Sequence, residues 1–283
     1  MAGDPSAVGS VALGLASAAS WGAGDFAGGL ASRRAPALGV VVASQAVGIA
    51  LLVVLSTVTA EAAPSVRQVL WAALAGANGA LGLFALYSAL ASGRMGIAAP
   101  VSGVVGALVP VLAGSLVHGP PRPIRLAGFG LAVAGVWLLT AANLDASRAG
   151  LRELGLPVLA GVSFGLFLVF IHRAGPAVLL PLIVARVTSM GVLAAIGGAA
   201  GTLTLPARSA LGLTCLAGVL DTGGNAFFAL AAQTGRLDVA GVLSSLYPAS
   251  TVALACLLLG ERLTRRQVAG AIATLAAIAL VSW

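Results

Sequence analysis

Three charged side chains lie well inside long apolar stretches of the sequence, away from the ends of these stretches: Asp25, Arg186 and Asp221. A charge surrounded by apolar groups is costly unless it meets an opposite charge or water, so each of the three marks a candidate functional position. Arg186 lies near the middle of its stretch, where it could bind a carboxylate substrate or pair with Asp221 or Asp25. A guanidinium that reaches toward the nearest polar surface is the structural alternative. We treat the three residues as a candidate coupling or ion-pair set.

A second group of polar residues has helical spacing. Asp221 and Asn225 are four positions apart and share one helix face, and Phe228 continues the same stripe. Asn78 occupies a comparable depth in an earlier apolar stretch, one position from the repeat equivalent of Asp221. Polar faces at matching depths predict a cavity between two parts of the chain. The alternative is a set of interhelical hydrogen bonds that only stabilise a helix bundle.

Trp21 and Asp25 are also four positions apart, near the start of the chain. On a helix they would face the same space, with the ring stacked on an apolar ligand and the carboxylate available to take a proton. This pattern favours a binding site coupled to protons. A partly hydrated carboxylate near a helix end is the alternative interpretation.

Tyr247 and Pro248 lie in the middle of an apolar stretch, directly after Ser244-Ser245-Leu246. A proline inside a helix removes one backbone hydrogen bond and kinks the helix, which leaves a carbonyl free to face a ligand or water. We expect such kinks at Pro248 and at Pro100, with a simple packing kink as the alternative. Ser244 and Tyr247 complete the candidate substrate-binding residues, with Trp21, Asp25, Asn78, Asp221, Asn225 and Phe228.

The composition predicts which elements position these residues. Of the 283 residues 59% are hydrophobic and 8% are charged, whereas a soluble domain carries roughly 25% charged residues. A membrane-spanning helix needs about 20 apolar residues. The sequence has ten such apolar runs, at about 9–31, 37–58, 68–92, 96–117, 124–143, 155–172, 177–200, 208–232, 237–259 and 267–282. The runs are continuously apolar rather than alternating, which excludes a β-barrel.

Charge and cysteine usage exclude several functions. The formal net charge is +7, and every basic residue is an arginine. Nearly all the arginines lie between apolar runs, where they anchor helix ends, so the charge does not indicate nucleic-acid binding. Cys215, Cys256 and the two histidines give no metal-ligand spacing. We expect no metal, no cofactor and no catalytic residues.

The two halves of the sequence resemble each other. Gly93-Arg94 recurs as Gly235-Arg236, and Pro36-Ala37 recurs as Pro176-Ala177. Internal repetition predicts two five-helix repeats, which we place at residues 1–146 and 147–283. A repeat with an odd number of spans must insert its second copy upside down, and inverted repeats are typical of transporters. The expected fold is therefore an all-α integral membrane protein of ten transmembrane helices in two inverted five-helix repeats.

The second half contains Gly235-Arg236-Leu237-Asp238, Tyr247-Pro248 and Gly260-Glu261-Arg262-Leu263-Thr264, and the first half opens with Ser20-Trp21-Gly22. With these motifs the chain resembles the EamA-type transporters of the drug/metabolite transporter superfamily over essentially its whole length. The first half departs from the pattern, because Gly119-Pro120 stands where Gly260-Glu261 would be expected. The resemblance implies ten helices, a central cavity, alternating access and cytoplasmic termini in the cell inner membrane.

These observations predict a secondary transporter rather than an enzyme. Its expected substrates are small organic metabolites or drugs, amphipathic or amino-acid-like, with efflux favoured by the resemblance and protons as the candidate coupling ion. The expected partners are the substrate and the lipid bilayer, and the chain would act as a monomer or homodimer. A membrane-embedded enzyme or a channel is the alternative. More arginines follow odd-numbered runs than even-numbered ones, which by itself would place the termini outside; we follow the resemblance.

Overall fold

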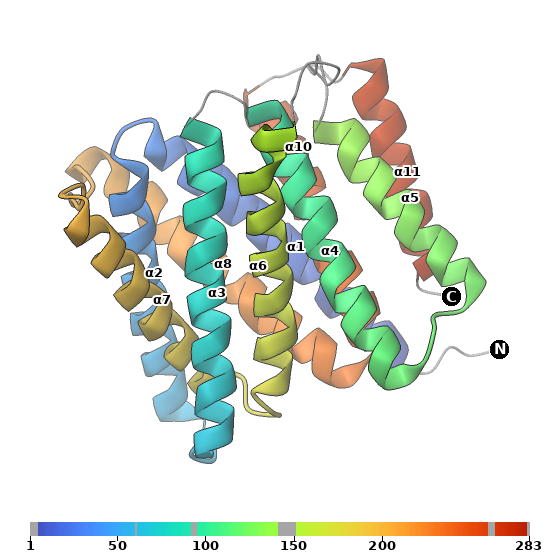
Figure 1. The fold of residues 1–283 in the computed structure, drawn as a ribbon, viewed down its shortest axis with the longest axis horizontal. Helices are drawn as coiled ribbons and strands as arrows, with labels where there is room; N and C mark the ends of the chain where they lie inside the picture. Colours follow the sequence, from blue (N-terminus) through green and yellow to red (C-terminus); the bar gives the residue numbers. More distant parts are fainter. Residues whose placement is uncertain (1–4, 60, 92–94, 141–150, 260–263, 282–283) are drawn as a thin grey trace.

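A computed structural model describes residues 5–59, 61–91, 95–140, 151–259 and 264–281 (Figure 1). Helices make up nearly all of these ranges, and their ends fall within a few residues of the expected apolar runs. In chain order they are α1 (Pro5–Ser32), α2 (Ala37–Val58), α3 (Val66–Ala91), α4 (Met95–His118), α5 (Pro123–Thr140), α6 (Leu151–Arg173), α7 (Leu179–Ala199), α8 (Arg208–Thr234), α9 (Leu237–Ser244), α10 (Tyr247–Leu259) and α11 (Arg265–Val281).

The helices α9 and α10 together occupy the single span expected at 237–259. The helix is interrupted at Ser245 and Leu246, where Leu246 N–H donates to the Leu243 carbonyl at 3.2 Å instead of continuing the α-helical pattern. Pro248 is the second residue of α10 and has no N–H to donate to the Ser244 carbonyl, so the interruption lies where the proline removes a helical hydrogen bond. With α9 and α10 counted as one, the described residues form ten helical segments, one for each expected apolar run.

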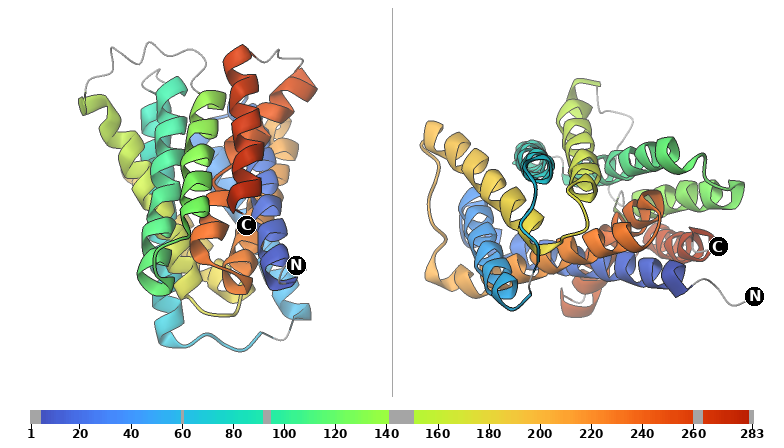
Figure 2. Two further views of the ribbon diagram at one scale, coloured as in Figure 1. Left: turned by 90° about the vertical axis from the view of Figure 1, so that its right-hand side faces the viewer. Right: turned by 90° about the horizontal axis from the view of Figure 1, so that it is seen from below.

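The packing of the helices follows the repeat. The contact of α1 with α8 corresponds to the contact of α6 with α3 in the other half (Figures 1 and 2). In the same way, the contact of α4 with α6 corresponds to that of α10 with α1. The pairs α2–α7 and α5–α11 each join the same helix of the two repeats. Exchanging the two halves leaves this set of neighbours unchanged, as a twofold relation between them requires. The predicted fold of two inverted five-helix repeats is confirmed. The expected boundary at residues 146 and 147 lies outside the described residues.

Several helices have the length and composition to cross a membrane. Large apolar side chains such as Val58, Leu70, Leu116 and Leu257 are exposed on the outside of the bundle, as expected for contact with lipid. Among the described residues, five segments are individually long and apolar enough to span: Leu38–Val58, Val66–Ala85, Leu154–Arg173, Leu179–Ala199 and Arg208–Thr234. Two shorter apolar helical segments are Val101–Val117 and Pro123–Leu138.

The contact between α1 and α8 is rich in hydrogen bonds. Ser10, Ser17 and Ser20 on α1 donate to backbone carbonyls of α8 at 2.8, 2.8 and 2.6 Å. Their spacing places all three hydroxyls on one face of α1. Small polar residues allow two membrane helices to approach closely and hydrogen-bond to each other. This contact fixes α1 against α8 beside the polar residues described below.

The equivalent contact between α3 and α6 is apolar. Gly79 and Gly82 on α3 lie under the rings of Phe167 and Phe164 of α6, and a methyl group at Gly82 would come within 2.8 Å of the Phe164 ring. The two halves therefore use the same pair of helices with different chemistry.

Candidate functional site

Arg186 on α7 is the centre of a polar cluster that joins three helices. Its side chain is 5% exposed, and its Nη2 donates to Asp221 Oδ2 on α8 at 2.5 Å. Its Nη1 donates to Gln45 Oε1 on α2 at 2.6 Å. The Arg186 Nε is buried and makes no hydrogen bond within the described part of the chain. Of the pairings open to Arg186 from sequence, the structure contains the one with Asp221, and it adds Gln45 as a second partner.

A glycine on α2 makes room for the guanidinium. A methyl group on Gly48 would lie 2.8 Å from Arg186 Nη1 and 2.5 Å from Thr222 Oγ1, closer than carbon atoms approach nitrogen or oxygen without displacement. Glycine at this position lets the backbone of α2 lie directly against the cluster. Nearby, Gly218 of α8 lies against the Ser44 carbonyl of α2, so the two helices cross closely at the depth of the ion pair.

The two charges of the ion pair differ in exposure. The Asp221 side chain is 45% exposed, whereas its partner Arg186 is 5% exposed. Asn225, one turn further along α8 and 8% exposed, donates from Nδ2 to the Asp221 carbonyl at 2.7 Å and to Asp221 Oδ2 at 3.4 Å. The carboxylate therefore keeps open surface that a ligand or water can reach, while the guanidinium is enclosed by protein.

A second carboxylate, that of Asp25, lies close to the first. The preceding residue, Gly24, lets α1 lie directly against the Asp221 backbone. A methyl group added at Gly24 would lie only 3.3 Å from the Asp221 backbone nitrogen. Asp25 is near enough to Asp221 and to Tyr247 for its charge to act on both. Its side chain is exposed although these helices surround it, and it makes no hydrogen bond or ion pair within the part of the chain that the structure describes. Asp25 therefore adds a second accessible carboxylate beside Asp221, with no hydrogen-bond or ion-pair partner among the described residues.

Three aromatic rings lie beside these carboxylates. Trp21, one turn before Asp25 on α1, stacks on Phe228 of α8 with 6.1 Å between ring centroids. Tyr247, the first residue of α10, meets Trp21 edge to face at 6.5 Å and 84°. Phe228 is fully buried, whereas Trp21 and Tyr247 are partly exposed. The Trp21 indole lies against Gly224, where a methyl group would collide with Cδ1 of the ring. The exposed faces of Trp21 and Tyr247 thus border the same region as Asp25.

The remaining residues predicted from sequence lie elsewhere. Ser244 is fully buried and donates to the Gly14 carbonyl of α1 at 3.4 Å, so its hydroxyl lies in the packing between α9 and α1. Asn78 donates from Nδ2 to the Leu74 carbonyl of its own helix at 2.8 Å. Neither of these two hydrogen bonds involves a residue of the Arg186 cluster. The helix α4 continues through Pro100 without interruption.

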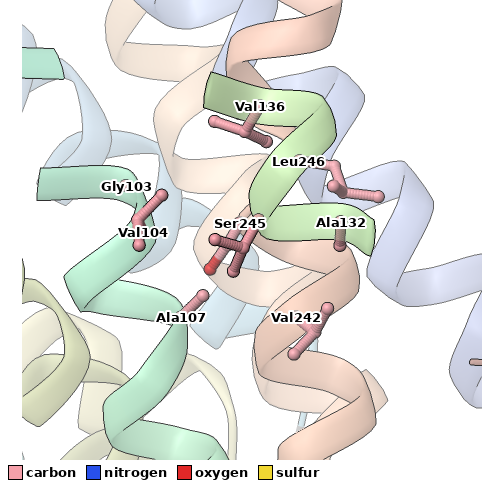
Figure 3. Close-up of a pocket in the computed structure, with 9 residues that line it drawn as sticks. Gly103, Val104, Ala107, Ala132, Val136, Val242, Ser245 and Leu246 are labelled. Carbon is pink, nitrogen blue, oxygen red and sulfur yellow. The ribbon is translucent and has the colours of Figure 1, made fainter. Parts of the chain in front are cut away.

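The structure also contains a small pocket between α4, α5 and the junction of α9 and α10 (Figure 3). Its walls are apolar except for Ser245. Its volume of about 10 Å³ leaves room for about one water molecule. No residue of the polar cluster lines it. The pocket is the space opened beside the interrupted helix, and it is too small for an organic solute. Its lining residues are Gly103, Val104, Ala107, Ala132, Val133, Val136, Val242, Ser245 and Leu246.

Glu61, in the connection between α2 and α3, was not singled out from sequence. Its two carboxylate oxygens accept hydrogen bonds from the backbone N–H groups of Val178, Leu179 and Leu180 at 2.9–3.0 Å, which caps the start of α7. Partial burial alone would raise the pKa of Glu61, but the hydrogen bonds from Leu179, Leu180 and Val178 outweigh it and hold the pKa below its ordinary value. Glu61 therefore ties the first half to the second at one end of the bundle.

Two inverted five-helix repeats with a buried arginine near their contact are typical of membrane transporters. The model of the EamA-like transporter family matches residues 9–141 and 152–283, so the chain belongs to the EamA-like transporter family of the drug/metabolite transporter superfamily. A solved structure described only as "Crystal structure of protein" shares the fold, with a TM-score of 0.76 and 16% sequence identity over 96% of this chain and 95% of that chain. No curated protein matches the sequence significantly.

Proposed function

We propose that this transporter moves small amphipathic or amino-acid-like organic solutes by alternating access, with the substrate between α1, α8 and α10. The observation that carries the proposal is the meeting of two accessible carboxylates, Asp25 and Asp221, with the Trp21 and Tyr247 rings beside the ion pair of Arg186. Polar side chains that orient a ligand and aromatic surface that contacts its apolar body are the features of a small-molecule site.

The position of these residues supports alternating access. Trp21 and Asp25 belong to the first repeat, whereas Asp221 and Tyr247 belong to the second, so a bound solute would touch both. The contact between Arg186 and Gln45 also crosses from one repeat to the other. Rocking of one repeat against the other would change these cross-repeat contacts and open the site to one side of the membrane at a time.

Several finer features belong to the same proposal. The carboxylates of Asp25 and Asp221 are the candidate proton acceptors for coupling, with Arg186 as the fixed counter-charge. We further propose export from the cell, an inner-membrane location and cytoplasmic termini, on the strength of the family alone. Asn78, Ser244 and the kinks at Pro100 and Pro248 stay as predicted contributors to the site or its motion.

The test is counterflow in proteoliposomes. A thermal-shift screen of amino acids, nucleosides and cationic dyes selects solutes that stabilise the purified protein. Vesicles loaded with a selected unlabelled solute should then accumulate the labelled solute transiently above equilibrium, with saturable kinetics. The Cys215→Ser variant, altered at an exposed position on α8, is the matched control and should transport normally. Flux that rises linearly with concentration and shows no counterflow would indicate a channel and overturn the proposal.

A further inference from the structure

We infer that the site selects organic cations, with an ammonium group at Asp25 and the apolar body of the solute against Trp21 and Tyr247. This inference rests on the proposed function and narrows its substrate class. It predicts that an amine binds better than the amino acid with the same side chain.

The charges around the site leave one negative charge unbalanced. Arg186 from α7 and Asp221 from α8 neutralise each other at 2.5 Å. The other polar groups of the cluster, Gln45 from α2 and Asn225 from α8, carry no charge. Asp25 from α1 adds a carboxylate with no partner among the described residues. A lone charge inside a membrane protein is stabilised by a counter-charge, so the site favours a cation.

The aromatic rings point to an organic cation rather than a simple metal ion. Trp21 and Asp25 are one helical turn apart on the same face of α1. Tyr247 lies edge-on to the Trp21 ring, and its hydroxyl end is close to Asp25. A cation over the face of a Trp or Tyr ring is attracted by the ring electrons, and the ring also contacts an apolar body. The carboxylate and the two rings thus match the two parts of an amphipathic amine.

The same geometry disfavours a carboxylate on the solute. Arg186, the cation of the cluster, is 5% exposed and already donates to Asp221 and Gln45. A solute carboxylate would have to displace Asp221 from this ion pair. Otherwise it would lie near the Asp25 carboxylate, which carries the same charge, and be repelled by it. Zwitterions and anions should therefore bind more weakly than the matching amine.

Three indole compounds test this inference because they differ chiefly in charge: tryptamine is a cation, tryptophan a zwitterion and indole-3-propionate an anion. Equilibrium binding to the full-length protein in detergent is measured for each by competition against radiolabelled tryptamine, and directly with each labelled compound. We expect tryptamine to bind at least about tenfold more tightly than tryptophan, since like charges at close range change affinity by more than that factor. Indole-3-propionate should bind more weakly still.

The Asp25→Asn variant separates the role of the charge from the role of the rings. It should remove most of the preference for tryptamine while leaving indole-3-propionate no weaker than in the unmodified protein. The Cys215→Ser variant should keep the order of affinities unchanged. The inference is overturned if tryptophan binds as tightly as tryptamine, or if Asp25→Asn leaves the tryptamine affinity within about twofold of the starting value, a change too small for loss of a charge pair.

The result also distinguishes this inference from the proposed function. Counterflow of any solute together with equal affinity for amine and amino acid would reject cation selectivity and leave the transporter proposal standing. Counterflow of other solutes by a protein that does not bind tryptamine would likewise reject cation selectivity and leave the transporter proposal standing. If no indole compound binds and no screened solute shows counterflow, both proposals fail.

Discussion

Removing one charge from the ion pair of Arg186 and Asp221 should lower the unfolding free energy by an amount that depends strongly on which of the two charges is removed. Asp221→Asn leaves a guanidinium that is 5% exposed with only Gln45 as a strong partner. An uncompensated buried charge costs about 3–5 kcal/mol of unfolding free energy. Arg186→Met instead leaves a carboxylate whose side chain is 45% exposed and can be hydrated. The Arg186→Met variant should therefore lose only about 1 kcal/mol of unfolding free energy, close to the contribution of a surface ion pair.

The double variant provides the sharper test. In Asp221→Asn/Arg186→Met the buried charge is gone, so the protein should be more stable than Asp221→Asn alone, by about 2 kcal/mol or more from the difference between the two costs. The unfolding free energy is measured by titration with a denaturing detergent, with circular dichroism as the signal. The Cys215→Ser variant, at an exposed position on the same helix as Asp221, is the matched control and should change stability little.

Two outcomes would refute this reasoning. Equal losses for the two single variants would mean that the difference in exposure between Arg186 and Asp221 does not decide the cost. A double variant whose loss equals the sum of the single losses would mean that the two charges do not interact.

Three further predictions concern contacts between helices and a helix cap. Gly48→Ala should displace the guanidinium of Arg186 and cost about 1–3 kcal/mol of unfolding free energy, whereas Gly29→Ala, where a methyl group has open space, should be neutral in the same titration. Ser17→Ala should cost about 0.6 kcal/mol through its hydrogen bond to α8. Glu61→Gln should lower stability at pH 7 by about 0.5–2 kcal/mol, as expected for a helix cap. Because the pKa of Glu61 is lowered from 4.5 on folding, this contribution is present above the unfolded pKa and is lost as the pH falls through the folded one. Melting temperatures measured from pH 7 down to about pH 3 should therefore converge for the two proteins; a constant difference would contradict the capping role.

The elements of the fold were predictable because their ends carry chemical signals. Arginines, glycines and prolines separate the apolar runs, and the observed helices begin and end within a few residues of them. The interruption of the ninth span was harder to position. Pro248 predicted a kink, but the helix breaks at Ser245 and Leu246, because the missing N–H of a proline affects the turn before it.

The candidate site was predictable only where its residues share a helix. The pair Asp221 and Asn225 follows from helical spacing, as does the pair Trp21 and Asp25. The role of Gln45 depends on how α2 packs against α7, which spacing within one helix does not specify. The serines of α1 do carry a signal, since Ser10, Ser17 and Ser20 recur on one helix face. The cap by Glu61 depends on a contact between distant parts of the chain and has no local signal.

We propose that the solute binds beside Trp21 at the contact between the two repeats. Binding at this position can be followed by fluorescence in a variant that keeps Trp21 as its only tryptophan, with Trp71, Trp137 and Trp283 replaced by phenylalanine. A transported solute without an indole should change the Trp21 fluorescence saturably, with the same half-saturation as its counterflow. A matched variant that keeps only Trp137, on α5, should show no such change. Transport that persists with no response at Trp21, or with an equal response at Trp137, would contradict the account.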